Sequence, residues 1–567
     1  MAKPYKKEAV ATRWDSEVRM LAWLATVVSV CSFLFYFQRG EVLLYGDAVA
    51  HINIARRVFD SRTPGLLQLG TVWLPLPHLL MIPFLVSIRM WRTGAGGSIP
   101  SMAAYVFGVI GIFRLTRNAL SRTAELDGPA RVAAWVAAVI YAANPNLIYM
   151  QSTAMGESVY LAFFIWAVAY FGEAVRGNLG AWTKCGLCLA AACLTRYDGW
   201  FLAIVMAATA LAIALWPEGS SRIAGKDAPP GRPRDRQAYQ TSRVRRAIVK
   251  FILITAVAPV LWLAYNEIVY QNPLEFANGP YSAKAIEMRT QSGGNPGHPG
   301  TGSPLTSGLY FLKAAQDNVA ENAWLARAWV LGLVTAVGLV LARLRKGVLG
   351  PQWSLFFLLI PIPFYALSVA YGGVPIFIPQ WWPFTHYNAR YGLQLLPAFA
   401  VALALMVDLA IRARWERRLR GALILAVLLL VIASYVSVWG AQPITLVEAE
   451  VNMRTRNQLE KEVGNWLEHL PPNASLLMYL GDHVGVMQRA GIPLSHTINE
   501  GNHRTWRQPT DPEGLWERAL ADPTKYADYI LAFEGDPVWQ AVHGLHLREL
   551  VEIQVTGQAR AVLYRVR

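Results

Sequence analysis

Apolar runs of about twenty residues recur along this chain from Leu21 to Trp439, and no such run follows Ala441. A helix that crosses the hydrocarbon core of a bilayer needs about 20 predominantly apolar residues. The expected spans lie at 20–38, 99–115, 130–149, 157–175, 183–197, 199–216, 247–267, 325–343, 352–371, 390–411 and 420–439. The sequence therefore predicts a polytopic α-helical membrane protein with about 11 spans over residues 1–440.

The remaining residues, 441–567, alternate helical and strand-like patterns. Helices are expected over 448–469 and 484–490, and strands over 475–480, 529–534 and 558–566. Such alternation predicts a small α/β domain. A polar domain of this size also explains why the mean hydropathy is only +0.29 although 54% of the residues are hydrophobic.

The net charge of +15 raises the question of nucleic-acid binding, but most Lys and Arg residues lie in short loops between the spans. Membrane topology explains that distribution, because cytoplasmic loops carry an excess of basic residues. No Lys/Arg-rich helix with base-reading side chains is present, so the sequence indicates no nucleic-acid partner. We expect an inner-membrane (cytoplasmic membrane) protein whose N-terminus is cytoplasmic.

Whether the apolar, proline-containing segment 72–88 crosses the membrane decides the predicted orientation of the chain. If it does not cross, the basic loops fall on the cytoplasmic side, and we predict a re-entrant or interfacial helix within an outer loop 39–98. The C-terminal domain is then extracytoplasmic. The Pro/Arg/Gly-rich segment 217–246 is expected to be an irregular cytoplasmic linker. The Gly/Pro-rich outer loop 268–324 is either a lid over a substrate or a plain linker.

The first outer loop contains the sequence YGDAVAHINIARR, which follows the first span. Asp47 and His51 are four residues apart and share one face if this segment is helical. Arg56 and Arg57 stand in an outer loop, where basic residues are disfavoured, and this indicates a local anion such as a lipid phosphate. Two alternatives remain open: Asp47 caps the helix, and the arginines contact ordinary lipid headgroups.

Three further polar positions fall at the outer boundary of the spans. Glu157 opens its span after a short outer loop, although an acid also favours a helix N-terminus in its own right. Arg196 and Asp198 lie in an otherwise apolar hairpin, where ionisable groups are functional or form a structural pair. Arg390 opens the span 390–411 from the outside and could reach a phosphate there.

These elements appear in a fixed order along residues 20–410. The segments are Gly46-Asp47-Ala48, Leu74-Pro75-Leu76-Pro77-His78, Ala154-Met155-Gly156-Glu157, Thr195-Arg196-Tyr197-Asp198-Gly199-Trp200 and Asn388-Ala389-Arg390-Tyr391-Gly392. The set resembles the GT-C superfamily of polyprenyl-phosphate-sugar-dependent glycosyltransferases, which includes protein mannosyltransferases and lipid A aminoarabinose transferases. In that family the C-terminal α/β domain is a variable accessory.

The resemblance implies an inverting transfer from a polyprenyl-phosphate-linked sugar to an acceptor lipid, glycan or protein in the membrane. Asp47 would be the general base. Cations would assist the departure of the lipid phosphate. The expected catalytic residues are Asp47 and Glu157, and the expected substrate-binding residues are His51, Arg56, Arg57, His78, Arg196 and Arg390.

Each outer-loop motif offers a single acid, and two isolated acids make a poor site for Mg²⁺ or Mn²⁺. We therefore expect no cofactor and favour metal independence, although a divalent cation stays possible. The alternative function is a multi-span transporter or flippase for a lipid-linked envelope precursor. Such proteins are built from repeats with charged groups near the bilayer midplane, and we see no internal repeat in this sequence.

Overall fold

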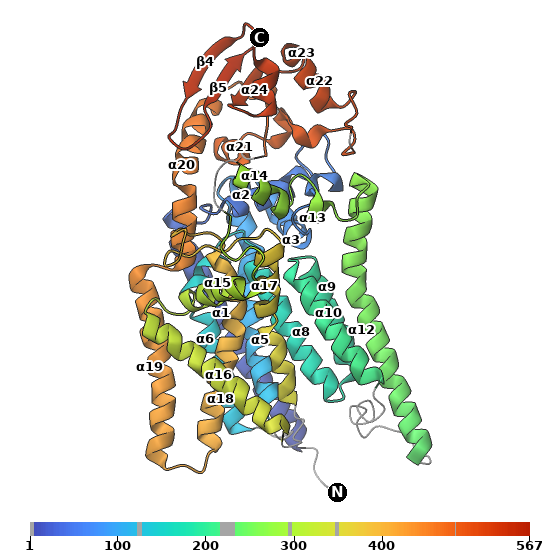
Figure 1. Cartoon of the computed structure of the whole chain (residues 1–567), viewed down its shortest axis with the longest axis vertical. Coiled ribbons are helices and arrows are strands. Elements are labelled where there is room, and N and C mark those ends of the chain that lie inside the picture. The colour runs from blue at the N-terminus through green and yellow to red at the C-terminus, as the bar shows by residue number, and fades with distance from the viewer. Residues whose placement is uncertain are drawn as a thin grey trace.

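The computed structural model describes residues 5–121, 127–215, 233–292, 297–345, 351–481, 483–507 and 509–566. Figure 1 shows a tall bundle of helices with a smaller mixed domain at one end, opposite to the start of the first helix. Within the described residues, nine helices are long and apolar enough to cross a membrane, or ten if a bent pair counts as one span. The predicted fold class, a polytopic helical membrane protein with a small C-terminal α/β domain, is confirmed.

A helix stands at each of the eleven expected spans. In chain order these are α1 (Tyr5–Gln38), α5 (Ala95–Leu120), α6 (Gly128–Ala142), α8 (Glu157–Val175), α9 (Leu179–Cys193), α10 (Asp198–Leu215), α12 (Pro233–Tyr270), α16 (Ala323–Arg345), η2 (Pro351–Leu359) with α17 (Pro361–Tyr371), η3 (Ala389–Leu395) with α18 (Leu396–Arg412), and α19 (Arg417–Ala441).

Two of these elements differ from a regular span. Helix α9 has only 15 residues, so it is shorter than a crossing helix. The expected span 130–149 is broken into α6 and α7 (Pro145–Gln151), which meet at an angle of 63°. Pro145 lacks a backbone N–H, and the side chain of Asn144 accepts from the Leu147 N–H at 2.9 Å. The new cap and the proline together start a second helix in a new direction.

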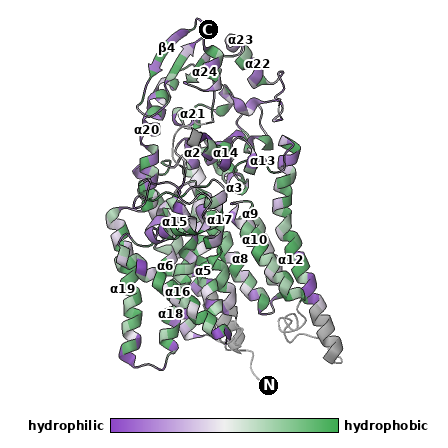
Figure 2. Cartoon of the chain, viewed as in Figure 1, coloured by the Kyte–Doolittle hydropathy of each residue, from purple (hydrophilic) through white to green (hydrophobic). Residues whose placement is uncertain are grey.

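The surface of the bundle is apolar, as Figure 2 shows for the peripheral helices α12, α16 and α19. Leu253, Val257 and Ile268 on α12 are more than half exposed. Water would not tolerate such a continuous apolar surface, whereas hydrocarbon does. The span containing α18, in contrast, is 83% buried and forms the centre of the bundle.

The first loop folds into short helices rather than a span. These are α2 (Gly46–Arg57), η1 (Leu66–Leu69), α3 (Leu76–Leu85) and α4 (Ile88–Arg92). Helix α3, which covers most of segment 72–88, has ten residues, about half of what a crossing helix needs. It packs beside α2 at the end of the bundle that carries the C-terminal domain (Figure 1).

Two loops contain more regular structure than their composition indicates. Of the expected linker 217–246, residues 217–232 lie outside the described residues, but the remainder is helical because α12 begins at Pro233. The loop 268–324 contains α13 (Glu275–Asn278), α14 (Ala283–Ser292) and α15 (Pro304–Asp317). Ser303 caps α15, and buried Phe311 packs into the bundle core, so local capping and burial prevail over the Gly/Pro content.

The C-terminal domain consists of a five-stranded sheet and its covering helices, with strand order β2-β1-β3-β5-β4. Strands β2, β1 and β3 are parallel, and β5 pairs antiparallel with both of its neighbours, β3 and β4. The elements are α20 (Ile444–Leu467), β1 (Leu476–Met478), α21 (Val484–Ala490), η4 (Leu494–His496), β2 (Thr497–Ile498), η5 (Glu500–Asn502), α22 (Leu515–Ala521), α23 (Pro523–Tyr526), β3 (Tyr529–Phe533), α24 (Pro537–Val542), β4 (Arg548–Ile553) and β5 (Ala561–Arg565). Strands β2 and β4 were not predicted: β2 has two residues, and β4 is a largely exposed edge strand.

Candidate functional site

Arg390 lies where the bundle meets the C-terminal domain and contacts three carboxylates. Its Nη2 donates to Asp47 at 2.5 Å, its Nη1 to Glu448 at 2.7 Å and its Nε to Glu157 at 3.2 Å. The four residues come from η3, α2, α20 and α8. The side chains of Arg390, Glu157 and Glu448 are 7%, 1% and 0% exposed, whereas that of Asp47 is 38% exposed. Asp47 is thus the accessible member of a buried ionic cluster.

The backbone around Arg390 is fixed from two sides. The Ala389 N–H donates to Glu448 Oε2 at 2.6 Å, and the Ala389 carbonyl accepts from the Asn318 amide at 2.8 Å. Asn388 adopts a left-handed conformation with φ of 56°, which asparagine tolerates better than most residues. These contacts turn the chain into η3 so that the Arg390 side chain enters the cluster.

Asp47 lies in the first turn of α2, but its carboxylate accepts a hydrogen bond from Arg390. The N-cap position of α2 is Tyr45, which makes no side-chain capping bond. The preceding Gly46 faces the guanidinium of Arg456 from α20, and a Cβ on Gly46 would collide with it. A larger residue directly before Asp47 would therefore displace the Arg456 guanidinium from its present position.

A second arginine shares Glu157 with Arg390. Arg196 Nη1 donates to Glu157 Oε1 at 3.1 Å and Arg196 Nε to Asp198 at 3.2 Å. The Tyr365 hydroxyl completes this group by accepting from Arg196 at 2.9 Å and donating to Asp198 at 3.1 Å. Among the residues that the structure describes, the other Glu157 oxygen has no hydrogen-bond partner although it is buried. Glu157 thus orients two guanidinium groups at once.

His51 and His78 form a buried pair behind Asp47. His51 Nδ1 and His78 Nε2 are 2.8 Å apart, and His51 also packs against the ring of Trp73. Burial lowers the pKa of both imidazoles; the nearby Asp47 and Glu157 carboxylates only partly oppose this at His51. Both rings are therefore neutral near pH 7, so one nitrogen of the pair donates and the other accepts.

Arg56 and Arg57 point elsewhere. Arg56 Nε donates to Asp60 at 2.7 Å, and its Nη1 donates to the carbonyls of Leu85 and Val86. Arg57 lies 3.7 Å from Glu500 in the C-terminal domain. Both arginines of this first-loop motif therefore have partners inside the protein. Of the eight predicted site residues, the structure brings Asp47, Glu157, Arg196 and Arg390 into one cluster with His51 and His78 beside it, and it does not bring Arg56 or Arg57 there.

Glu448 is the cluster member that the sequence did not reveal. It lies on α20, a helix expected to be amphipathic, and glutamates on such helices are usually solvent-exposed. The one available signal is Ile444, an apolar residue four positions earlier and therefore on the same face of the helix. Its partner Arg390 lies 58 residues earlier, a separation that no local pattern bridges.

The acids of the cluster contact arginines rather than one another. Within the described part of the chain, no three His, Cys, Asp or Glu side chains are grouped as metal ligands. Asp47, Glu157, Asp198 and Glu448 form ion pairs with Arg196 and Arg390, so four acids pair with two arginines. Metal independence stays a prediction.

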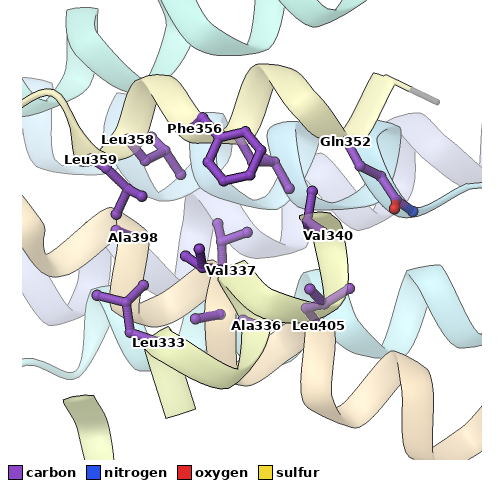
Figure 3. A pocket seen from close by; sticks show the side chains of 13 residues that line it. Leu333, Ala336, Val337, Val340, Gln352, Phe356, Leu358, Leu359, Ala398 and Leu405 are labelled. Atoms are coloured by element: carbon purple, nitrogen blue, oxygen red, sulfur yellow. The ribbon is translucent and has the colours of Figure 1, made fainter. Parts of the chain in front are cut away.

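Two apolar pockets lie in the bundle, away from this cluster. One, of about 40 Å³, lies between α16, η2 and α18, and Figure 3 shows Leu333, Phe356 and Leu405 around it. The other is a groove of about 740 Å³ between α6, α18 and α19, lined by residues such as Trp135 and Leu428. Neither pocket includes a member of the cluster, and both are lined almost entirely by side chains that offer packing and no acid–base chemistry.

No family model and no curated protein matches the chain. Solved structures do match. ArnT from Cupriavidus metallidurans bound to undecaprenyl phosphate superposes with a TM-score of 0.54 at 13% identity, over 97% of this chain and 98% of ArnT. The apo state of that ArnT gives 0.51 at 14% identity, over 98% of both chains.

The chain has the GT-C fold. The resemblance expected from the sequence is thereby confirmed, and it extends over nearly the whole chain, C-terminal domain included. The Archaeoglobus fulgidus oligosaccharyltransferase AglB, in complex with an inhibitory peptide and a dolichol-phosphate, also matches, with a TM-score of 0.46 at 12% identity over 96% of this chain and 74% of AglB.

Proposed function

We propose that this chain is an integral-membrane glycosyltransferase that moves a sugar from a polyprenyl-phosphate donor to an acceptor hydroxyl on the extracytoplasmic face. The observation that carries the proposal is the exposed carboxylate of Asp47, held by the buried Arg390 at one end of a GT-C bundle. The ArnT structure with undecaprenyl phosphate supports a lipid-phosphate donor. A transporter would need its charged groups along a path near the midplane, whereas this cluster lies at the end of the bundle.

In the proposed reaction Asp47 accepts the proton of the acceptor hydroxyl as that oxygen attacks the anomeric carbon. The bond between the anomeric carbon and the phosphate oxygen breaks, and the lipid phosphate leaves with the electron pair. Attack opposite to the leaving group inverts the configuration. Arg390 holds the Asp47 carboxylate in a fixed orientation, because a charge-assisted hydrogen bond is short and directional.

The leaving phosphate needs cations that still have access to it. Arg390 uses all three nitrogens on carboxylates and is 7% exposed, so we assign it to holding the acids. Arg196 and Arg456 are 18% and 22% exposed; Arg196 contacts Glu157 of the cluster, and Arg456 lies against Gly46, the residue before Asp47. We therefore assign phosphate binding to Arg196 and Arg456, with His51 as a neutral donor or acceptor toward the sugar.

The test uses the full chain in proteoliposomes with undecaprenyl-phosphate sugars labelled in the sugar, and a membrane lipid extract as the acceptor. A glycosyltransferase releases undecaprenyl phosphate and moves the label to a new product. A transporter or flippase returns the donor chemically intact, on the opposite leaflet. Recovery of intact donor with translocated label would contradict the proposal.

A further inference from the structure

The first helix of the C-terminal domain, α20, forms part of the wall of the Asp47 cluster. The Thr445 carbonyl accepts at 2.7 Å from the hydroxyl of Tyr45, which precedes Asp47 by two residues. About three turns further along α20, the Arg456 guanidinium lies against Gly46. Helix α20 thus follows the chain from Tyr45 into α2, and Glu448 lies between these two contacts.

Glu448 reaches deepest into the cluster. Its side chain is fully buried, and both its oxygens are used: one accepts from Arg390 Nη1 at 2.7 Å and the other from the Ala389 N–H at 2.6 Å. The carboxylate therefore holds the side chain of Arg390 and the backbone that carries it. Burying an acid is costly unless its partners are well placed, and these two contacts provide them.

The rest of the domain anchors α20 firmly to the first loop. Asn53 on α2 donates to Gln488 at 2.7 Å, and Gln68 donates to the Gly501 carbonyl at 2.7 Å. Asp60 accepts from the Ser495 N–H at 3.0 Å. Each of these bonds joins the loop that carries Asp47 to the domain that carries Glu448. The domain is therefore built into the site rather than appended to the bundle.

We propose that Glu448 is a positioning residue: through Arg390 it orients Asp47, so that the C-terminal domain completes the reaction site. This inference rests on the proposed function. Arg390, His51, Tyr387 and Tyr391 lie close enough to Asp47 to interact with its charge. Without the negative charge of Glu448, Arg390 has one charged partner fewer, so the guanidinium that orients Asp47 is held less firmly.

The experiment compares Glu448→Gln with Glu462→Gln, which makes the same change on the same helix at a residue that accepts from the neutral side chain of Gln458. Each purified protein is titrated with undecaprenyl phosphate to count binding-competent molecules. Its kcat is then measured with the undecaprenyl-phosphate sugar that the wild type uses. Asp47→Asn is measured alongside.

For Glu448→Gln we expect normal lipid-binding stoichiometry and a kcat about 100-fold lower, as small misplacements of a catalytic group cost that much. We also expect Glu448→Asp, which keeps the negative charge, to recover part of the rate. Glu462→Gln should match the wild type. A loss of kcat that merely follows a loss of binding-competent protein, or a Glu448→Asp variant no faster than Glu448→Gln, would overturn the inference. If wild type and Asp47→Asn turn over equally, it is the proposed function that fails.

Discussion

Arg390 Nη2 and the carboxylate of Asp47 are 2.5 Å apart, although 343 residues separate them in the sequence. The arginine is buried and the aspartate is partly exposed, so the pair presents one accessible carboxylate on a buried support. Two further acids, Glu157 and Glu448, complete this support by accepting from the remaining nitrogens of the guanidinium. No other residue reproduces the geometry of an arginine that binds three carboxylates.

Replacing Arg390 by Gln should destabilise the protein by about 3–5 kcal/mol, because buried Glu448 then has no cationic partner and Glu157 loses one of two. Thermal unfolding of the detergent-solubilised protein measures this. Arg560→Gln is the matched control, since Arg560 is 36% exposed and pairs with the exposed Glu552, and its loss should cost roughly 0–1 kcal/mol. Equal unfolding of the two variants would show that the cluster adds no stability.

Replacing Glu157 by Gln removes the charge that Arg196 and Arg390 share, so both guanidinium groups should shift. We expect kcat for sugar transfer to fall about 100-fold. Glu173→Gln provides the control on the same helix, because Glu173 pairs with Arg114 at the opposite end of α8. If Glu157→Gln retains the activity of Glu173→Gln, Glu157 contributes only to folding.

The His51–His78 pair should make stability depend on pH. Burial holds the pKa of both rings below the ordinary value of 6.5. The unfolded chain therefore binds protons that the folded protein does not, and stability falls as the pH drops below about 6.5. Above that pH the pair makes its full contribution to the free energy of unfolding. The loss should be at most about 1.4 kcal/mol per pH unit for each histidine.

Unfolding free energies between pH 5 and 8 test this expectation. His78→Gln should reduce the slope, since one buried imidazole is removed and His51 keeps a hydrogen-bonding neighbour. His469→Gln, at an exposed histidine of the C-terminal domain, should leave the slope unchanged. A wild-type slope that persists in His78→Gln would assign the pH dependence to other groups.

Much of the fold follows from local sequence, because spans of about 20 apolar residues are local features. Asp47, Glu157, Arg196 and Arg390 could be proposed together since the predicted topology places all four at the same membrane boundary. Glu448 could not, because its contact with Arg390 depends on how α20 docks after the last span. Helical structure at 233–246 and in α15 also escaped; in α15 the Ser303 cap and the burial of Phe311 prevailed over composition.

Arg56 illustrates a different kind of miss. Its partner Asp60 is four residues away, and an ion pair at this spacing is a common feature of helix surfaces. The sequence therefore contains a nearby partner for Arg56, whereas the predicted location of the loop on the outer side indicated a phosphate. The partner of Arg57, Glu500, lies in the C-terminal domain and could be identified only from the tertiary structure.

The most direct test of the central claim compares Asp47→Asn with Asp511→Asn in sugar transfer from undecaprenyl-phosphate sugars at matched expression. Asp511 lies on the C-terminal domain, where its side chain contacts Arg504. The account predicts that Asp47→Asn abolishes transfer while still binding undecaprenyl phosphate, and that Asp511→Asn transfers like the wild type. Transfer by Asp47→Asn at the wild-type rate would contradict the account.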